Sequence, residues 1–443
     1  MVWQELGAIG ERQVELLSQA RRLLRAVKET QKSVLDPELY LNSWADVRGN
    51  AKLRRVAYGW RVMPFLWLSR LRDVFGLVRY GVPTASAFPD SERKFFSLVL
   101  SWAKSTDFGP DGVYRDRYLG VSSADTPQTL WLLLFLDRDV PSFLSENIVL
   151  LSTSRTSSWF GVFGNILKFF SRPVQFSCYS KSFADHVATI LIKLTVMYGV
   201  RRVVMPYEAQ PFQQTVGFRL QTSSHFVETV GYLHSMLPAL PTDLIYRKGA
   251  PDKLLVHGDG QKEILVEWLG WSAESINVIE SLRYRVGDAT FAGKILLPYD
   301  IRQADKLLMS LEAYFRQAPL ESMPSWIIQN HPVMHNSPLH KKFMDDVGVL
   351  LAKYSDRISS SPFLKNEVII VGRTAAIIEA LERKLEVIHV CTEPLFEMHT
   401  PALWKYLTVE CLAPSVYRYR LSEYGQYIRF GGEWLNPAAI LGL

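Results

Sequence analysis

Residues 367–390 read Glu-Val-Ile-Ile-Val-Gly-Arg-Thr-Ala-Ala-Ile-Ile-Glu-Ala-Leu-Glu-Arg-Lys-Leu-Glu-Val-Ile-His-Val, and this stretch decides the fold class. It predicts an apolar strand, a turn at Gly372, a short helix beginning at Arg373-Thr374 and a second apolar strand. The free N–H groups and the dipole at such a helix start favour an anion. Most such units in doubly wound folds bind nothing, so the local sequence does not decide whether this turn binds a phosphate.

The same alternation of strands and helices extends upstream. A chain of 443 residues is too long for one core. We therefore predict an α/β fold with two Rossmann-like domains and parallel sheets, divided into residues 1–275 and 276–443. We expect one long helix at residues 1–35, a mixture of aromatic helices and turns at 36–125, and a last helical stretch at 401–407. Strands are expected at 149–152, 201–205, 229–232, 253–256, 292–298 and 326–329, while 128–136 fits a strand or a helix.

Composition excludes several classes of protein. A net charge of +6 is small for this length and acidic residues are interspersed, which argues against nucleic-acid binding. The three cysteines are far apart in sequence and fit neither a metal site nor a disulfide framework, so a reducing, cytoplasmic compartment is expected. We see no secretory signal and expect no transmembrane helix. The basic, aromatic segment from Lys52 to Arg79 suits a peripheral contact with an anionic membrane or an ordinary amphipathic helix on a core.

Two polar residues of the first domain follow predicted strands. Glu208 comes after the strand at 201–205, and His234 comes after the strand at 229–232. Ligands bind at the carboxyl ends of parallel strands, so both are candidate catalytic residues. Glu208 can serve as a general base or a nucleophile, and His234 can orient a hydroxyl or pair with a phosphate. The alternatives are a structural salt bridge for Glu208 and a buried, satisfied histidine for His234.

The second domain offers candidate residues for binding a nucleotide. His331 and Pro332 follow the strand at 326–329, and the proline holds the chain extended. Gly372, Arg373 and Thr374 form the expected phosphate turn. Glu379, one helical turn later, can accept hydrogen bonds from a ribose or pair with Arg383 on the helix surface.

The usual cofactor and metal motifs are missing from the sequence. There is no Walker loop, no Gly-x-Gly-x-x-Gly after a strand, no His-Glu-x-x-His and no Asp-x-Asp pair. His331 and His335 have a spacing that ligates metal on a helix, but Pro332 and Pro338 argue against a regular helix there. We therefore expect neither a metal nor a cofactor, and a departing phosphate would need basic side chains and a helix terminus.

The order of these motifs resembles a known group of proteins. Tyr-Glu-x-Gln at 207–210, Gly-Tyr-x-His-Ser at 231–235, His-Pro at 331–332 and the unit ending in Glu-Ala-Leu at 379–381 are similar to bacterial surface-carbohydrate biosynthesis proteins. More distantly they resemble GT-B glycosyltransferases that use CMP-Kdo or CMP-sialic-acid-like donors. The resemblance spans 201–407 and departs from the family at Arg373-Thr374, where Ser-Ser or Ser-Thr is usual.

The resemblance implies a GT-B fold, with the acceptor on the first domain and the donor on the second, across a cleft. By position, Glu208 would be the catalytic carboxylate, and His331-Pro332 and Gly372-Arg373-Thr374 would hold the nucleotide. The resemblance also implies metal-independent transfer of a nonulosonic acid from a CMP donor. The acceptor would be a lipid-linked molecule or an oligosaccharide of lipopolysaccharide or capsule synthesis, and the reaction would take place at the cytoplasmic face of the inner membrane. A CDP-alcohol or other nucleotide-sugar transferase and an inactive GT-B scaffold are the alternatives.

Overall fold

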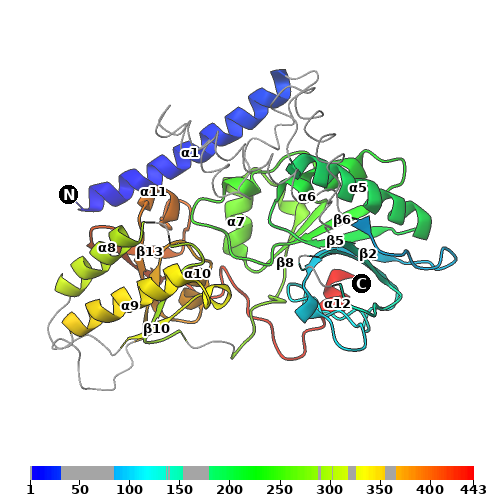
Figure 1. Cartoon of the computed structure of the whole chain (residues 1–443). Coiled ribbons are helices and arrows are strands. Elements are labelled where there is room, and N and C mark those ends of the chain that lie inside the picture. Colours follow the sequence, from blue (N-terminus) through cyan, green and yellow to red (C-terminus); the bar gives the residue numbers. More distant parts are fainter. Residues whose placement is uncertain are drawn as a thin grey trace, which may run out of the picture.

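The chain contains two α/β domains, each built around one sheet, with a long N-terminal helix lying across both (Figure 1). This computed structural model describes residues 2–30, 84–135, 137, 140–152, 179–287, 291–301, 303–317, 326–354 and 366–443. The basic, aromatic segment from Lys52 to Arg79 lies outside the described residues, so the prediction of a membrane contact there stays a prediction.

The first sheet has eight strands in the order β1-β4-β3-β2-β5-β6-β7-β8. All neighbours are parallel except β1, which pairs antiparallel with β4. After the edge strand β1, the chain enters the middle of the sheet at β2, runs outward through β3 to β4, and returns to β5 on the other side of β2. The point where the strand order reverses therefore lies between β2 and β5. The strands are β1 Thr84–Ala85, β2 Ser97–Ala103, β3 Thr129–Phe135, β4 Ile148–Ser152, β5 Arg202–Pro206, β6 Glu228–Tyr232, β7 Lys253–Val256 and β8 Ile276–Val278.

Strands buried on both faces explain the near-continuous apolar runs in this domain. Every residue of β3, Thr-Leu-Trp-Leu-Leu-Leu-Phe, is buried, which settles the 128–136 segment as a strand. Helices α5 Tyr179–Tyr198, α6 Pro211–Gln221 and α7 Asp259–Glu267 contribute to the core on one face. The loop after β2 and the last helix, α12 Pro437–Leu441, cover the other face.

The second sheet has six strands in the order β10-β9-β11-β12-β14-β13. Its first four strands are parallel, and the order reverses between β9 and β11. Helices α8 and α9 pack on one face, while α10 and α11 pack on the other. The elements are β9 Lys294–Leu296, α8 Ala304–Gln317, β10 Ile327–Gln329, α9 Pro338–Lys353, β11 Glu367–Val371, α10 Ala376–Glu382, β12 Glu386–Val390, α11 Pro394–Glu397, β13 Leu407–Ala413 and β14 Val416–Leu421.

Two predictions of secondary structure are wrong. Residues 401–406 form turns that lead into β13, which begins at Leu407 and pairs antiparallel with β14 as a hairpin on the sheet edge. Residues 407–410 alternate between buried and exposed, which is the period of a strand and not of a helix. Residues 36–125 contain β2, a central and mostly buried strand, where aromatic helices were expected.

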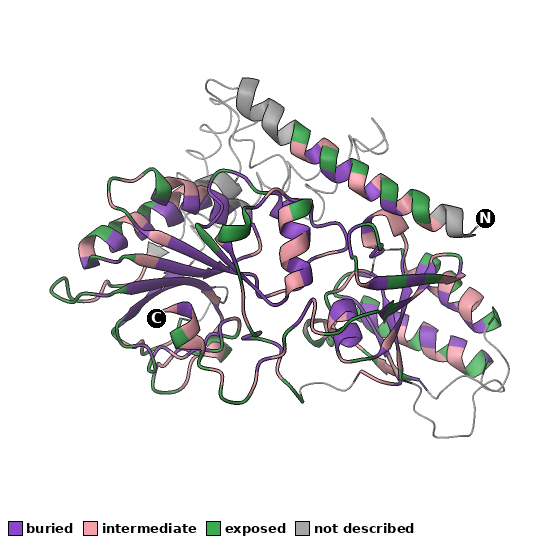
Figure 2. Cartoon of the chain, turned by 180° about the vertical axis from the view of Figure 1, so that it is seen from behind, coloured by how far each residue is buried: buried purple, intermediate pink, exposed green. Residues whose placement is uncertain are grey.

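The predicted N-terminal helix is confirmed in the described residues as α1, Val2–Thr30. Buried and exposed residues alternate along it (Figure 2), and Leu16, Leu17 and Ala20 join the largest apolar core. Near its start, Gly10 packs against Ala402 of the second domain, and further on Arg21 donates a hydrogen bond to the carbonyl of Trp268 in the first. The helix therefore contacts both domains.

The fold class is confirmed: the chain is α/β, with two Rossmann-like domains and a helical N-terminus. The predicted boundary at 275/276 stays a prediction, although β8 at Ile276–Val278 belongs to the first sheet. The chain also returns to the first domain at its end, where Ser97 donates a hydrogen bond to the carbonyl of Gly442. No helix among the described residues is long and apolar enough to cross a membrane.

Candidate functional site

A cavity of about 520 Å³ lies between the two domains, at the carboxyl ends of strands from both sheets. Its walls include the residues after β5 and β6 on one side and after β9, β11 and β12 on the other. The cavity therefore adjoins a strand-order reversal in each sheet, the place where open α/β sheets bind ligands. It is lined by Glu208, residues 236–239, Tyr299, Asp300, Gln303, Leu307, residues 372–375, Thr392, Glu393, Phe396, Glu397 and His399.

The structure brings the two predicted catalytic residues together. His234 Nε2 lies 3.0 Å from Glu208 Oε1, and the side chain of Gln210 donates to Glu208 Oε2 at 2.8 Å. Burial opposes ionisation of Glu208, but the hydrogen bond and the charge of His234 outweigh it and hold the pKa of Glu208 below its usual value. Arg202, a basic residue of the preceding strand that could have formed a structural salt bridge with Glu208, pairs with Glu228 instead.

The loop that carries Glu208 is fixed by one buried side chain of α6. Gln213 donates to the carbonyl of Pro206 at 2.6 Å and accepts from the backbone N–H groups of Glu208 and Gln210. Between them Ala209 has a φ of 53°, a left-handed conformation that disfavours residues with a Cβ atom. Such local strain persists where surrounding contacts determine the backbone, and it is common at functional sites.

The opposite wall contains the predicted phosphate turn. Gly372 has a φ of 66°, and a Cβ atom there would lie 3.0 Å from Pro298 Cγ, so the turn requires glycine. His389 Nε2 lies 2.9 Å from the carbonyl oxygen of Gly372, and its Nδ1 lies 3.1 Å from the hydroxyl of Tyr419. Burial lowers the pKa of His389 to about 4. A neutral imidazole on β12 therefore holds the turn through its Nε2–H.

The helix after this turn differs from the prediction. It begins at Ala376 rather than at Arg373-Thr374, and it has seven residues. The hydroxyl of Thr374 accepts a hydrogen bond from the N–H of Ala376 at 3.3 Å, which holds the turn just before the short helix. Gly372, Arg373 and Thr374 all line the cavity. Their assignment to a nucleotide stays a prediction.

The remaining predicted site residues lie further from the cavity. His331 contacts Tyr299, a lining residue, with ring centroids 5.5 Å apart, but His331 itself is not among the lining residues. Pro332 is exposed and begins a 3₁₀ turn, Pro332–Met334. Glu379 forms an ion pair of 3.0 Å with Arg383, as the alternative reading of that residue had it.

The sequence prediction missed several cavity residues. Asp300 comes shortly after β9 and Glu393 after β12, so the strand-end rule used for Glu208 would have found both. His399 follows α11, where no sequence signal marks it. It is 3% exposed, and burial, then His389 and Arg373, lower its pKa to about 3, so its imidazole is neutral. Among the described residues, its Nδ1 has no hydrogen-bond partner.

Acidic side chains outnumber basic ones among the described residues that line the cavity. Four carboxylates line it, and Arg373 is the only Lys or Arg among the described lining residues. Burial raises the pKa of Glu397, which accepts hydrogen bonds from the backbone and hydroxyl of Thr392. Across the described part of the chain, no group of three or more His, Cys, Asp or Glu side chains is placed to hold a metal ion.

Comparison with known proteins gives only a distant structural likeness. No family model matches the sequence, and no curated protein matches it. A trehalose-6-phosphate synthase from Burkholderia multivorans aligns with a TM-score of 0.35 and 10% identity over 61% of this chain and 71% of that one. A glycosyltransferase from Rickettsia africae aligns with a TM-score of 0.33 and 14% identity over 67% of this chain and 79% of that one. A sucrose-phosphate synthase from Thermosynechococcus elongatus aligns with a TM-score of 0.34 and 13% identity over 68% of this chain and 82% of that one. At this distance the likeness says nothing about substrate.

Proposed function

We propose that this chain is a glycosyltransferase that takes a nonulosonic acid from a CMP donor and transfers it to a glycan acceptor of the bacterial surface. One observation carries the proposal: a single cavity adjoins the strand-order reversals of both sheets, with Glu208 on one wall and Arg373 on the other. His234 lies behind Glu208, outside the lining, and holds it by a hydrogen bond. Two substrates that must meet need such a shared cleft, with one reacting group on each side.

Glu208 is the proposed catalytic carboxylate. Its lowered pKa keeps it ionised at neutral pH, so it can accept the proton of an acceptor hydroxyl as that oxygen bonds to the anomeric carbon. The bond from the anomeric carbon to the phosphate oxygen breaks in the same step, and CMP leaves with the electron pair. His234, hydrogen-bonded to Glu208, keeps the carboxylate aimed into the cavity.

Arg373 is the proposed counter-charge for the leaving phosphate. CMP donors carry one phosphate on the leaving group, whereas CDP and UDP donors carry two. One guanidinium lines the described part of the cavity, which fits one phosphate better than a diphosphate. This supports a CMP donor over a CDP-alcohol. The acceptor, lipid-linked or oligosaccharide, and a peripheral position on the inner membrane's cytoplasmic face belong to the same proposal.

Turnover measurements test the proposal with purified full-length chain. CMP-Kdo, CMP-sialic acid, CDP-glycerol and UDP-N-acetylglucosamine are each offered, and nucleotide release is followed with and without added oligosaccharides. We expect release of CMP by the wild type, and a loss of about 10³-fold or more in Glu208→Gln with the fold intact. Glu433→Gln, the same change at an exposed glutamate, is the control and keeps full activity.

The possible results separate the alternatives. Unchanged turnover in Glu208→Gln refutes the catalytic role. Turnover of CDP-glycerol alone identifies a CDP-alcohol transferase. If the wild type neither turns over nor binds any nucleotide in calorimetry, the chain is a scaffold and the proposal fails.

A further inference from the structure

Tyr118 stands directly beside the Glu208–His234 pair. Its ring meets the imidazole of His234 edge-on, with centroids 4.6 Å apart and an interplanar angle of 66°. On another side it contacts the indole of Trp102, at 5.7 Å and 68°. Trp102 is in β2, the strand that borders the order reversal of the first sheet. The tyrosine therefore packs where a ligand-binding crevice is expected, although it lies in a loop.

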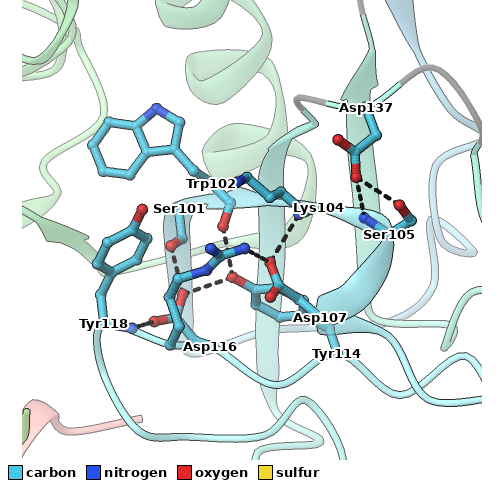
Figure 3. A network of polar contacts seen from close by, with 10 residues as sticks. Ser101, Trp102, Lys104, Ser105, Asp107, Tyr114, Asp116, Tyr118 and Asp137 are labelled. Carbon is cyan, nitrogen blue, oxygen red and sulfur yellow. Dashed lines mark hydrogen bonds and ion pairs between the residues drawn. The ribbon is translucent and has the colours of Figure 1, made fainter. Parts of the chain in front are cut away.

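A buried carboxylate fixes the turn that carries Tyr118 (Figure 3). Asp116 is 4% exposed and accepts hydrogen bonds from the hydroxyl of Ser101 at 2.5 Å and that of Tyr114 at 2.8 Å. It also accepts from the backbone N–H groups of Tyr118 and Leu119, both at 2.7 Å. Four donors on one buried group tie the turn to β2, so the backbone of Tyr118 has little freedom.

The imidazole of His234 needs such a neighbour. Because Glu208 is ionised and can only accept, the hydrogen bond between them requires the proton on Nε2. In most oriented histidines the other ring nitrogen is held by a second hydrogen bond. Here Nδ1 of His234 is buried without a partner among the described residues. The guanidinium of Arg283 contacts the backbone carbonyl of His234, which anchors the chain but not the ring.

We propose that Tyr118 is a positioning residue that holds the His234 ring by packing, so that Nε2 faces Glu208. The inference rests on the proposed function for its catalytic meaning, but the geometry that it explains can be measured without turnover. Removing the ring opens space beside His234, and the imidazole can then rotate and exchange protons between its nitrogens. The Glu208 carboxylate loses its donor for part of the time.

The test is nitrogen NMR of full-length protein labelled at histidine, with the His234 signals assigned from the spectrum of His234→Gln. In the wild type, at a pH high enough for the imidazole to be neutral, we expect Nε2 at the position of a protonated nitrogen and Nδ1 at that of an unprotonated one. In Tyr118→Ala the two signals move toward each other, as an exchanging mixture requires. If the proposed reaction is observed, its rate falls by about 100-fold, the size expected for a misplaced catalytic group.

Two control variants make the result specific, and a third replaces the alanine variant if that one does not fold. Tyr118→Phe keeps the ring and retains the wild-type spectrum and rate. Tyr246→Ala removes another tyrosine that makes an edge contact, in its case 5.3 Å from Trp271, and leaves His234 unchanged. Tyr118→Leu fills part of the volume, so it serves if the alanine variant does not fold. Unmoved His234 signals in the folded alanine or leucine variant overturn the proposal, whether or not any donor is turned over.

Discussion

Replacing Gln13 by alanine should loosen the contact between α1 and the second domain. Gln13 is fully buried, and its amide donates to the carbonyls of Leu395 at 3.1 Å and Met398 at 2.8 Å. Its carbonyl accepts from the hydroxyl of Thr400 at 2.6 Å. These partners belong to the segment that also supplies Phe396 and His399 to the cavity wall.

The size of the effect follows from the groups left without partners. Two carbonyls and one hydroxyl lose a hydrogen bond, at about 1 kcal/mol each, for a total of about 3 kcal/mol. Alanine is the better helix former, which returns only a few tenths of a kcal/mol. Leu16, Leu17 and Ala20 remain buried in the core, so the helix stays docked most of the time. Three kcal/mol corresponds to about a 100-fold rise in the equilibrium for local opening.

Native-state hydrogen exchange of the α1 amides measures this opening directly. We expect about 100-fold faster exchange in Gln13→Ala. Gln19→Ala is the matched control, because Gln19 is on the same helix but donates only to the exposed Glu15. Its exchange should stay within about threefold of the wild type. A change below about threefold in Gln13→Ala would refute the role of these hydrogen bonds.

Two further predictions concern the sheet end of the first domain. Gln213→Leu leaves one carbonyl and two N–H groups of the 206–210 loop without partners. We therefore expect urea denaturation to show a free energy of unfolding lower by about 3 kcal/mol. A decrease of less than about 0.5 kcal/mol would contradict the role of Gln213 in holding this loop. Burial, assisted by His234 and Arg283, lowers the pKa of His257 to about 3 from an ordinary value of 6.5. Because the unfolded state then binds more protons, this residue lowers stability as pH falls from 6.5 toward 3, by about 2 kcal/mol at pH 5. His257→Phe should therefore gain stability relative to the wild type between pH 7 and pH 5, and a pH-independent difference would show that His257 does not titrate.

Local patterns predicted much of the framework. The apolar run at Lys253–Val256 is a strand with the bounds expected. The alternation after residue 200 predicted the parallel strands β5, β6, β7, β9, β10, β11 and β12, but not β8. The rule that ligands meet the carboxyl ends of strands brought Glu208 and His234 together before their contact was known. These inferences succeed because strand burial and strand direction leave a short-range signal in the chain.

Long-range pairing left no such signal. Tyr118 and His234 are distant in sequence, and nothing near either residue indicates their ring contact. The helical stretch predicted at residues 401–407 is wrong because a helix and an edge strand compete for the same short apolar pattern, and the pairing of β13 with β14 decides the outcome. His331 was placed at a strand end correctly, but its ring packs on Tyr299 outside the lining of the cavity.

A crystal structure of Glu208→Gln with a CMP-sugar donor shows directly whether the cavity between the sheets is the donor site. We expect the donor in that cavity, with its phosphate within reach of Arg373 and its anomeric carbon toward position 208. A donor bound elsewhere would contradict the proposed site. So would a cavity that is empty in the crystal at saturating CMP-sugar together with no binding of the donor in solution.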